Sequence, residues 1–479
     1  MLSVNVAQSA HLYPSDQIDF DSFGADPTGV KDSTAALQAY IDAKIAAATS
    51  DRGYIAILRP GTFLISATLN LRGRANTYTG PFGIQGMPGR STIITGSVSG
   101  GYLVRRIANA STNGPSTIRD IGFINSSVTG AGCVSIGGVV GLNVSGCKFN
   151  SHGVMLNTAE IGTTAPLSTF NVTVRDCIFF GGPPGGVATG NLADAIGILS
   201  HGQTHISGCD FTALAEGVRL SGVGFSLTGS RFEVNKIGMN LGVREDGSIW
   251  LLSAGDFAGI SMEANDTAIA MKSVNMSRFS GILALGENSS PSGGSQYGIR
   301  MYANAGADVT VDSTLMNGSF SVVAISALDK RAIWTNVSAA NNSGQGVSSG
   351  IAWILPTDEV FNDHFVNCTG NNKISPISQT VPVTGKSYTI RDDNKGKVVV
   401  FNNIAPVAVS LPKPGQFNVA EQYVKFDQNW NVRIKNLGTG IVTITPVAST
   451  IDGGASISLA KYQSINIFSD GVNYYIGGH

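Results

Sequence analysis

Residues 204–281 read THISGCDFTALAEGVRLSGVGFSLTGSRFEVNKIGMNLGVREDGSIWLLSAGDFAGISMEANDTAIAMKSVNMSRFSG, and a two-residue phrase recurs in this stretch. A charged residue directly precedes a phenylalanine four times, at steps of 21, 25 and 22 residues: Asp210-Phe211, Arg231-Phe232, Asp256-Phe257 and Arg278-Phe279. In a strand, neighbouring side chains point to opposite faces, so a stacked phenylalanine would face inward and the charge outward. The stretch therefore predicts stacked coils with an outward row of Asp, Arg, Asp and Arg.

The phenylalanine repeat extends beyond this stretch, and a second strand phrase follows several of its members. That phrase has a small residue, an aliphatic residue, any residue and another aliphatic residue, as in 217–220 and 238–241. Two strand phrases every 21 to 32 residues describe one coil of a solenoid, whereas an array of β-sandwiches would not repeat in phase. The repeated phenylalanines are Phe123, Phe149, Phe179, Phe211, Phe232, Phe257 and Phe279.

The composition suits short strands and does not suit binding to nucleic acid or membranes. Sixty glycines and only 13% charged residues among 479 favour strands joined by tight turns. A net charge of -1 without a Lys/Arg cluster gives no general attraction to nucleic acid or an anionic membrane. No apolar run approaches the ~18 residues of a membrane helix, so we expect no membrane insertion. Residues 1–10 lack the features of a secretory signal, which predicts release by another route, such as cell lysis, or a trimmed start.

Three of the five cysteines, Cys147, Cys177 and Cys209, precede a repeated phenylalanine by two residues. This spacing would place them on one inward column of the coils. No histidine and no CxxC spacing accompanies them. We therefore predict reduced, buried, structural thiols rather than a metal site, and no cofactor.

Residues 18–71 begin with a turn and a capped helix. Residues 23–29, Phe-Gly-Ala-Asp-Pro-Thr-Gly, have turn chemistry, and Asp32-Ser33-Thr34 provides an N-cap. An alanine-rich helix is predicted over about 35–48, followed by strands over 54–58 and 63–71. A single amphipathic helix would cover something apolar with one face, formed by Leu37, Tyr40, Ile41 and Ile45.

This ordered phrase, from Phe-Gly-Ala-Asp through the capped helix to Pro60-Gly61-Thr62-Phe63, closely resembles the start of the pectate lyase-like superfamily, as it occurs in phage tailspikes and related polysaccharide-degrading proteins. The resemblance is specific in motif over residues 18–71 and in repeat pattern over roughly 90–372. It implies a right-handed parallel β-helix whose N-terminal end is capped by the helix, often assembled as a homotrimer.

From about residue 380 the sequence changes, with more Lys and Arg and with alternating strands such as 398–401. We therefore expect an all-β chain in three segments: an N-terminal cap with the first coils (1–89), a β-helix shaft (90–379) and a small antiparallel, β-sandwich-like domain (380–479). The closing residues 469–475 resemble the end of the β-sandwich modules that follow tailspike shafts. That resemblance implies trimerisation or weak sugar binding, and an end-cap for the last coil is the alternative.

Three Gly/Pro/Ser-rich stretches, 159–169, 181–192 and 287–296, lengthen individual coils. Insertions in a solenoid emerge on one side as loops. We expect binding sites beside these loops.

The resemblance implies cleavage of glycosidic bonds, either by hydrolysis with two carboxyl groups or by β-elimination with a base and a cation. If the phenylalanines set the register, Asp210 and Asp256 lie two rungs apart, roughly 10 Å between Cα atoms for rungs ~4.8 Å apart. Side-chain tilt would bring them into the ~6.5–9.5 Å range of an inverting pair. Glu233 would lie near Asp256 but point the other way in a regular strand, and only a corner of the coil at this position would rotate it into the groove.

A second register competes with the first. Glu233-Val234-Asn235 and Glu263-Ala264-Asn265 share the phrase Glu-x-Asn, and each is followed by the small-aliphatic strand. In this register Glu233 and Glu263 stack on neighbouring rungs, at about the 5 Å separation of a retaining pair. We favour the phenylalanine register because its spacings are more even. The candidate catalytic residues in the two registers are Asp210, Glu233, Asp256 and Glu263, although outward Asp and Arg on adjacent rungs often only pair with each other.

Five further residues are candidates for binding the substrate. Arg219, Arg231 and Arg244 would hold an acidic sugar or merely neutralise the acids. His201 fits a turn or a base, and Trp250 fits a ring that stacks on a sugar or a core strand.

We predict a tailspike-like depolymerase that binds and endo-hydrolyses a bacterial surface, capsular or exopolysaccharide, as a homotrimer in a phage virion or outside the cell. A polysaccharide lyase acting on a uronate-containing glycan and a non-catalytic glycan-binding fibre are the alternatives. The sequence lacks the Asp-Pro-His of alginate epimerases, the paired Asp cluster of polygalacturonases and the spacing of a calcium loop. The reaction type therefore stays open.

Overall fold

The computed structural model shows β-strands throughout the described residues and one α-helix, α1 (Thr34–Ala46), with 3-10 turns at η2 (Phe20–Phe23) and η3 (Pro88–Arg90). The chain divides into two compact units, Met1–Ala352 with Asp363–Asn371, and Trp353–Asn362 with Asn372–His479. The segment boundaries expected from the sequence stay predictions. The described residues are 18–48, 53–75, 77–128, 130–159, 169–181, 195–244, 246–286, 297–302, 306–307, 309–318, 323–327, 332–339, 353–354, 365–366, 368–370, 373–374, 380–391, 394, 397–418, 423–426 and 430–477.

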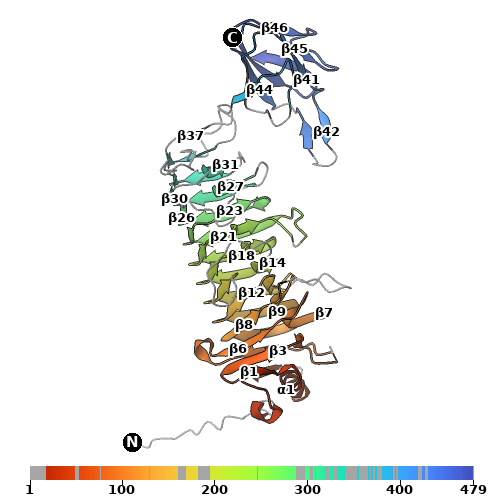
Figure 1. The fold of residues 1–479 in the computed structure, drawn as a ribbon, viewed down its shortest axis with the longest axis vertical. Coiled ribbons are helices and arrows are strands. Elements are labelled where there is room, and N and C mark those ends of the chain that lie inside the picture. Colours follow the sequence, from red (N-terminus) through yellow and green to blue (C-terminus); the bar gives the residue numbers. More distant parts are fainter. Residues whose placement is uncertain are drawn as a thin grey trace, which may run out of the picture. The chain divides into compact units, whose positions relative to one another are not determined.

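The first unit is a stack of coils whose strands pair in parallel with those of the neighbouring coils (Figure 1). One coil runs through β15 (Thr204–Ser207), β16 (Asp210–Thr212) and β17 (Glu216–Leu220). The next coil pairs with it, in the same order, through β18 (Gly222–Thr228), β19 (Arg231–Glu233) and β20 (Ile237–Leu241). Connections between parallel strands are right-handed. The unit is a right-handed parallel β-helix, as the sequence predicts.

The coils form three rows of strands, called here the first, second and third sheets. The first sheet is β1 (Thr28–Asp32), β3 (Gly61–Ile65), β6 (Thr92–Gly96), β8 (Ile121–Asn125), β10 (Lys148–Asn150), β13 (Ile178–Phe180), β16, β19, β22 (Ser261–Glu263), β26 (Leu283–Gly286), β30 (Leu315–Gly318), β33 (Ser338–Ala339) and β36 (Thr369–Gly370). The second is β4 (Leu69–Asn70), β11 (Val154–Asn157), β14 (Ile196–Ser200), β17, β20, β23 (Thr267–Met271), β27 (Tyr297–Met301) and β31 (Val323–Ala327). The third is β2 (Tyr54–Ile57), β5 (Phe82–Gln85), β12 (Phe170–Arg175), β15, β18, β21 (Leu252–Ala258), β24 (Val274–Asn275), β25 (Arg278–Ser280), β28 (Gly306–Ala307), β29 (Thr310–Asp312), β32 (Ile333–Thr335) and β35 (Phe365–Val366). Two long strands, β7 (Tyr102–Arg119) and β9 (Gly132–Ser145), run through both the second and third sheets. Most of the three expected loops lies outside the described residues.

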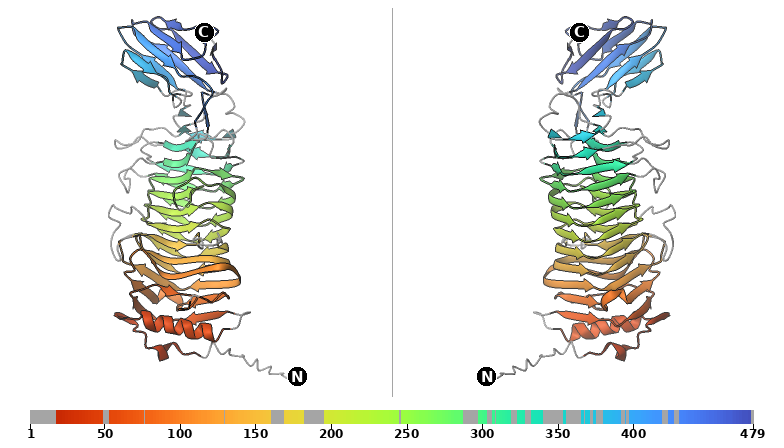
Figure 2. Two further views of the ribbon diagram at one scale, coloured as in Figure 1. Left: turned by 90° about the vertical axis from the view of Figure 1, so that its right-hand side faces the viewer. Right: turned by 90° about the vertical axis from the view of Figure 1, so that its left-hand side faces the viewer.

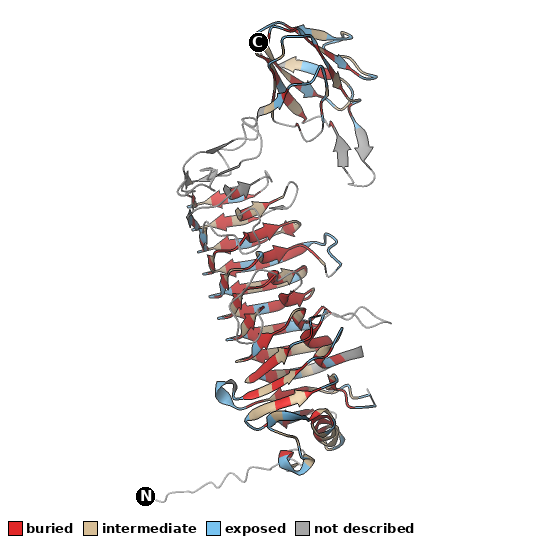
Figure 3. Cartoon of the chain, viewed as in Figure 1, coloured by how far each residue is buried: buried red, intermediate tan, exposed pale blue. Residues whose placement is uncertain are grey.

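The predicted phenylalanine stack is present and forms part of the buried interior, which is red in Figure 3. From Phe123 to Phe232, five consecutive rings on the first sheet stack with centroids 4.6–5.4 Å apart. The predicted cysteine column is also buried, and none of the five cysteines forms a disulfide. The hydrogen bond with Cys147, together with burial, raises the pKa of the Cys177 thiol. These thiols pack in the core, and the raised pKa keeps the Cys177 thiol protonated at pH 7.

The favoured phenylalanine register is wrong between Phe232 and Phe257. Phe232 pairs with Met262 on the first sheet, whereas Phe257 lies on the third sheet and pairs with Leu227 and Phe279. The repeat is therefore two separate ladders. The residues between β20 and β21 lengthen one coil. Phe257 of the third sheet therefore follows Phe232 of the first sheet at a spacing close to that of the phenylalanine repeat.

The predicted helix caps the first coils (Figure 2). Its side chains satisfy backbone groups at the open edges: the Gln38 amide donates to the Asn70 carbonyl and accepts from its N–H, and the Tyr40 hydroxyl does the same at Ile57. An uncovered sheet edge would otherwise invite aggregation. Leu37, Tyr40 and Ile41 are buried as predicted, but Ile45 is only half-buried.

The second unit differs from the expected antiparallel domain, since most of its strands alternate between two sheets with parallel pairing. One sheet is β38 (Thr380–Val383), β40 (Val398–Phe401), β44 (Asn431–Asn436), β47 (Ser464–Ser469) and β48 (Tyr474–Gly477). The other is β39 (Ser387–Thr389), β41 (Val407–Leu411), β45 (Val442–Pro446) and β46 (Ile457–Leu459). Pairing is parallel up to β44 and β45 and antiparallel beyond them. The unit also contains the antiparallel pair β42 (Gln416–Asn418) and β43 (Tyr423–Lys425), and the parallel pair β34 (Trp353–Ile354) and β37 (Lys373–Ile374).

Candidate functional site

The structure distributes the predicted site residues over three surfaces of the β-helix. The outward side of the first sheet carries Asp210, Arg231, Glu233 and Glu263, and this group is called the carboxylate face. A second group lies on the second sheet and at the corner that follows it: His201, Arg219, Arg244 and Trp250. Asp256 is alone on the third sheet.

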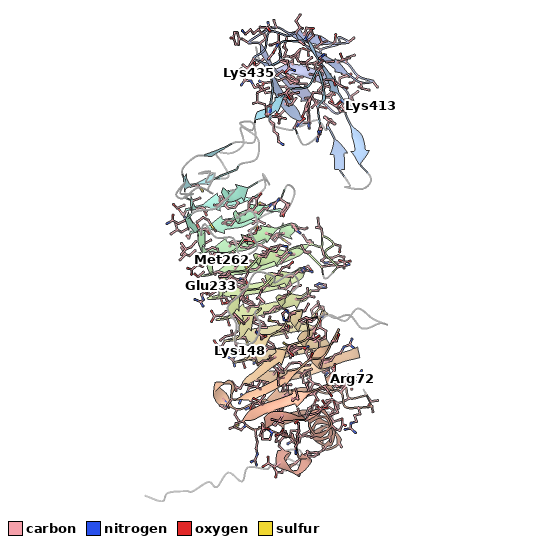
Figure 4. The ribbon with its side chains drawn as sticks, viewed as in Figure 1. Arg72, Lys148, Glu233, Met262, Lys413 and Lys435 are labelled. Carbon is pink, nitrogen blue, oxygen red and sulfur yellow. The ribbon has the colours of Figure 1, made fainter. Side chains whose placement is uncertain are left out.

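Strand alternation places the carboxylate face outside. Phe232 and Met262 are fully buried, so the residues on either side of them point away from the core. Figure 4 labels Lys148 and Glu233, which both belong to this sheet. The Arg231 guanidinium contacts both neighbouring acids, with Nε 3.4 Å from Asp210 Oδ1 and Nη2 3.1 Å from Glu233 Oε2. About half of its side chain is exposed, so these ion pairs contribute little to stability.

Glu233 and Glu263 lie directly opposite each other in the parallel register of β19 and β22. Their Cα atoms are therefore one rung apart, about 4.8 Å. Like charges in this position repel. Within the described part of the chain, Glu263 takes part in none of the ion pairs, whereas Glu233 has Arg231 beside it.

A ladder of buried asparagine amides fixes this register. Asn235 and Asn265 follow the corner residues Val234 and Ala264, whose φ angles of 56° and 51° turn the coil. The Asn265 Oδ1 atom accepts from the Asn235 N–H and side-chain amide, and its own amide donates to the Phe232 carbonyl. A buried amide without such partners would destabilise the fold, so the two Glu-x-Asn phrases must stack.

Apolar side chains flank the carboxylate face along the sheet. The outward positions of the preceding strand β13 are Ile178 and Phe180, in register with Asp210 and Thr212. Those of the following strand β26 are Leu283 and Leu285, in register with Ser261 and Glu263. Leu283 and Leu285 are exposed and Ile178 and Phe180 are half-buried. Acids bordered by such groups form a surface that can contact both the polar groups and the apolar face of a sugar ring.

Asp256 cannot pair with Asp210 as predicted, because the two residues lie on different sheets. The Asp256 partners are Ser226 and Arg278, and its side chain is exposed. Asp256 is also not the neighbour of Glu233 that the sequence suggested. The inverting pair is therefore excluded.

The second group brings together residues that the sequence proposed separately. The Arg244 guanidinium carbon lies 3.1 Å from the centroid of the Trp250 ring, and the Arg244 carbonyl accepts a hydrogen bond from Arg219. Burial and the nearby Arg244 and Arg219 charges lower the pKa of His201, which favours a neutral imidazole at pH 7. Its Nε2 atom is shielded from solvent and has no hydrogen-bond partner among the described residues.

Glu216, which was not predicted as a site residue, lies in the second group: its carboxylate accepts two hydrogen bonds of 2.6 and 2.7 Å from Arg219. Simple alternation would place residues three apart on opposite faces. The strand is irregular here, since both Gly217 and Val218 are buried inside the coil and a Cβ atom at Gly217 would meet the Phe232 ring. Nothing in the sequence pattern marks this irregularity.

The described residues contain no group of three or more His, Cys, Asp or Glu side chains that could hold a metal ion. Nor does the described part of the chain include a helix long and apolar enough to cross a membrane.

None of the protein-family models matches the chain, and no curated protein matches it. Several solved structures are similar to this chain. Endo-xylogalacturonan hydrolase from Aspergillus tubingensis is 10% identical with a TM-score of 0.48, over 73% of this chain and 98% of that one. ORF18 of Geobacillus virus E2 is 12% identical with a TM-score of 0.42, over 96% and 75%. The surface adhesin PfbA of Streptococcus pneumoniae is 9% identical with a TM-score of 0.41, over 96% and 98%.

These low identities carry no argument about activity, and they include both a hydrolase and an adhesin. The fold rests on the strand pairing of the chain itself. That pairing makes the first unit a right-handed parallel β-helix, the architecture implied by the resemblance to the pectate lyase-like superfamily.

Proposed function

We propose that the chain is a polysaccharide depolymerase that hydrolyses a bacterial surface, capsular or exopolysaccharide internally at the carboxylate face. The observation that carries the proposal is the register of Glu233 and Glu263 on neighbouring rungs. A separation of about 5–5.5 Å between two carboxyl groups is typical of retaining glycosidases, and one rung is ~4.8 Å. The proposed reaction is therefore hydrolysis with retention.

The surroundings of the two acids suggest their roles. A retaining enzyme needs one ionised carboxylate as nucleophile and one protonated carboxyl group as acid. Glu233 lies beside the Arg231 cation, which suits the nucleophile. Glu263 lies between Glu233 and the apolar Leu285, which suits the acid. The acid would protonate the leaving oxygen and then activate the water that releases the product.

The resemblance of residues 18–71 to tailspikes supports a bacterial glycan as the substrate, and a phage virion or the extracellular space as the place of action. It also supports a homotrimer. Light scattering of the purified chain tests the assembly, and a monomer mass would contradict it.

Product analysis tests the reaction. The purified chain is incubated with surface glycans of candidate host bacteria, and chain shortening and the anomeric configuration of new ends are measured. We expect retention, with E233Q and E263Q each slower by on the order of 10²–10⁴-fold and the third-sheet variant D256N unchanged. Ultraviolet-absorbing unsaturated ends would show a lyase instead. Binding without shortening would show a non-catalytic fibre, and either result contradicts the proposal.

A further inference from the structure

The second sheet and the corner that follows it carry a row of cations, three of which contact an aromatic ring, and this row lies away from the carboxylate face. Arg219 and Arg300 lie in the same column of the sheet, with the buried Asn240 and Ala270 between them, so the accessible part of the row runs along the corner. At the corner that follows the sheet, Lys272 and Tyr302 come directly after β23 and β27. The basic–aromatic strip comprises Arg219, Arg244, Trp250, Lys272, Tyr297, Arg300 and Tyr302.

Each of three cations lies over a ring. Arg244 lies over Trp250, as described above. The Lys272 ammonium lies 5.9 Å from the centroid of Tyr302, and the Arg300 guanidinium carbon lies 4.6 and 4.7 Å from those of Tyr297 and Tyr302. At exposed sites such contacts stabilise the fold by only about 0.5–1 kcal/mol each.

The charges of these three cations are not matched by ion pairs in the described part of the β-helix. Arg219 is paired with Glu216, and Asp246, on the exposed hairpin before Trp250, accepts a backbone hydrogen bond from Ser248. Counting these two acids, the described residues of the strip keep an excess of positive charge on a chain whose net charge is -1.

The aromatic residues indicate what kind of anion would fit. Trp250 is 46% exposed, so Arg244 leaves part of its ring open. A ring that is accessible on one face stacks well on the apolar face of a sugar, and a guanidinium beside it can hold a carboxylate with two hydrogen bonds. The repeat of a pyranose chain is also comparable with the ~4.8 Å rise of one rung.

We propose that the basic–aromatic strip binds an acidic polysaccharide lengthwise, with successive uronate carboxylates on Arg244, Lys272 and Arg300 and sugar rings on Trp250 and Tyr302. This binding does not depend on hydrolysis at the carboxylate face. It would hold a long glycan on one side of the β-helix while another part of the same glycan is hydrolysed.

Calorimetric titration of the full chain tests the strip with three probes: a linear oligogalacturonate long enough to cover four rungs, a neutral maltooligosaccharide of equal length, and oligothymidylate. We expect saturable, salt-sensitive binding of the oligogalacturonate alone. R244Q and R300Q should each weaken it about tenfold. The matched control R278Q, which removes an exposed arginine of the third sheet, should stay within about twofold.

A thermal melt of each variant confirms that it is folded, and W250A supplies an independent variant that leaves every charge in place. The E233Q/E263Q double variant should bind the oligogalacturonate as the unmodified chain does, which separates this proposal from hydrolysis. Equal binding of the neutral sugar, tighter binding of oligothymidylate, or an R278Q loss as large as that of R244Q would overturn the proposal. Absence of binding to any probe would overturn it as well.

Discussion

The first and third sheets of the β-helix carry the same sequence phrase, a charged residue followed by phenylalanine, but they present different chemistry. On the first sheet, Arg231 lies between Asp210 and Glu233, and a second glutamate lies one rung further on. On the third sheet, Asp256 lies between Ser226 and Arg278, without another acid on the neighbouring rungs. A repeated inward ring shows that coils stack, but it does not show which outward residues meet. The buried amides of Asn235 and Asn265 decide that.

The largest expected difference between the two sheets concerns catalysis. We expect E233A to lose the nucleophile and on the order of 10²–10⁴-fold in glycan cleavage. Added azide should restore part of the rate, because it can attack in place of the missing carboxylate. D256A should keep its full rate and gain nothing from azide. The rate of cleavage is measured by the release of new glycan chain ends. An equal loss of rate in D256A and E233A would contradict the assignment of catalysis to the first sheet.

The asparagine ladder gives the next effect. N265A removes the oxygen that accepts from the Asn235 N–H and side-chain amide, and it removes the amide that donates to the Phe232 carbonyl. We therefore expect the free energy of unfolding to fall by about 3 kcal/mol. Asn275 of the third sheet is the matched control, because its Oδ1 atom has no hydrogen-bond partner in the described residues. N275A should cost less than about 1 kcal/mol. Chemical denaturation measures both variants, and equal costs would count against the ladder as the determinant of register.

Double-mutant cycles between phenylalanines test the two ladders directly. Phe211 and Phe232 stack at 4.6 Å, so their alanine variants should show a coupling of about 0.5–1.5 kcal/mol. Phe232 and Phe257 belong to different sheets and make no ring contact, so their effects should add within about 0.5 kcal/mol. Strong coupling between Phe232 and Phe257 would restore the rejected register.

The smallest expected effect is the response of the third sheet to acid. Hydrogen bonds from Thr335, Asn336 and Ser313 lower the pKa of Asp312 below its usual value of 3.8. The stability that they contribute is present above that value and is lost as the pH falls through the lower pKa of the folded state. D312N should therefore lower the melting temperature slightly at pH 7 and make less difference at pH 2. A constant difference at both pH values would rule out this linkage.

Much of the architecture could be predicted because it follows from local pattern. The phrase Asp32-Ser33-Thr34, in which Ser33 is the N-cap and Asp32 accepts from the Thr34 N–H, marked the start of the helix, and the inward rings marked the coils. The step from Phe232 to Met262 could not be recognised, since methionine fills the same inward position without belonging to the aromatic repeat. The asparagine of the Glu-x-Asn phrase indicated the correct register, because a buried amide needs hydrogen-bond partners. The even spacing of the phenylalanines favoured the wrong one.

Other features left no signal in the sequence. Parallel and antiparallel strands share the same alternation, so the parallel pairing of β38 with β40 could not be read from residues 380–401. The strip on the second sheet depends on where the coils place Lys272, Arg300 and Tyr302, and these residues are far from Arg244 in sequence. Individual candidates such as His201 and Trp250 could be named from the sequence. It could not be predicted that they lie on a different surface of the β-helix from the acids.

A crystal structure of E263Q with an oligosaccharide cut from its own substrate tests the central claim most directly. We predict a sugar ring over the first sheet, with its anomeric carbon within reach of the Glu233 carboxylate and its leaving oxygen beside Gln at position 263. A glycan whose scissile bond lies over Asp256 on the third sheet, away from both glutamates, would contradict the account.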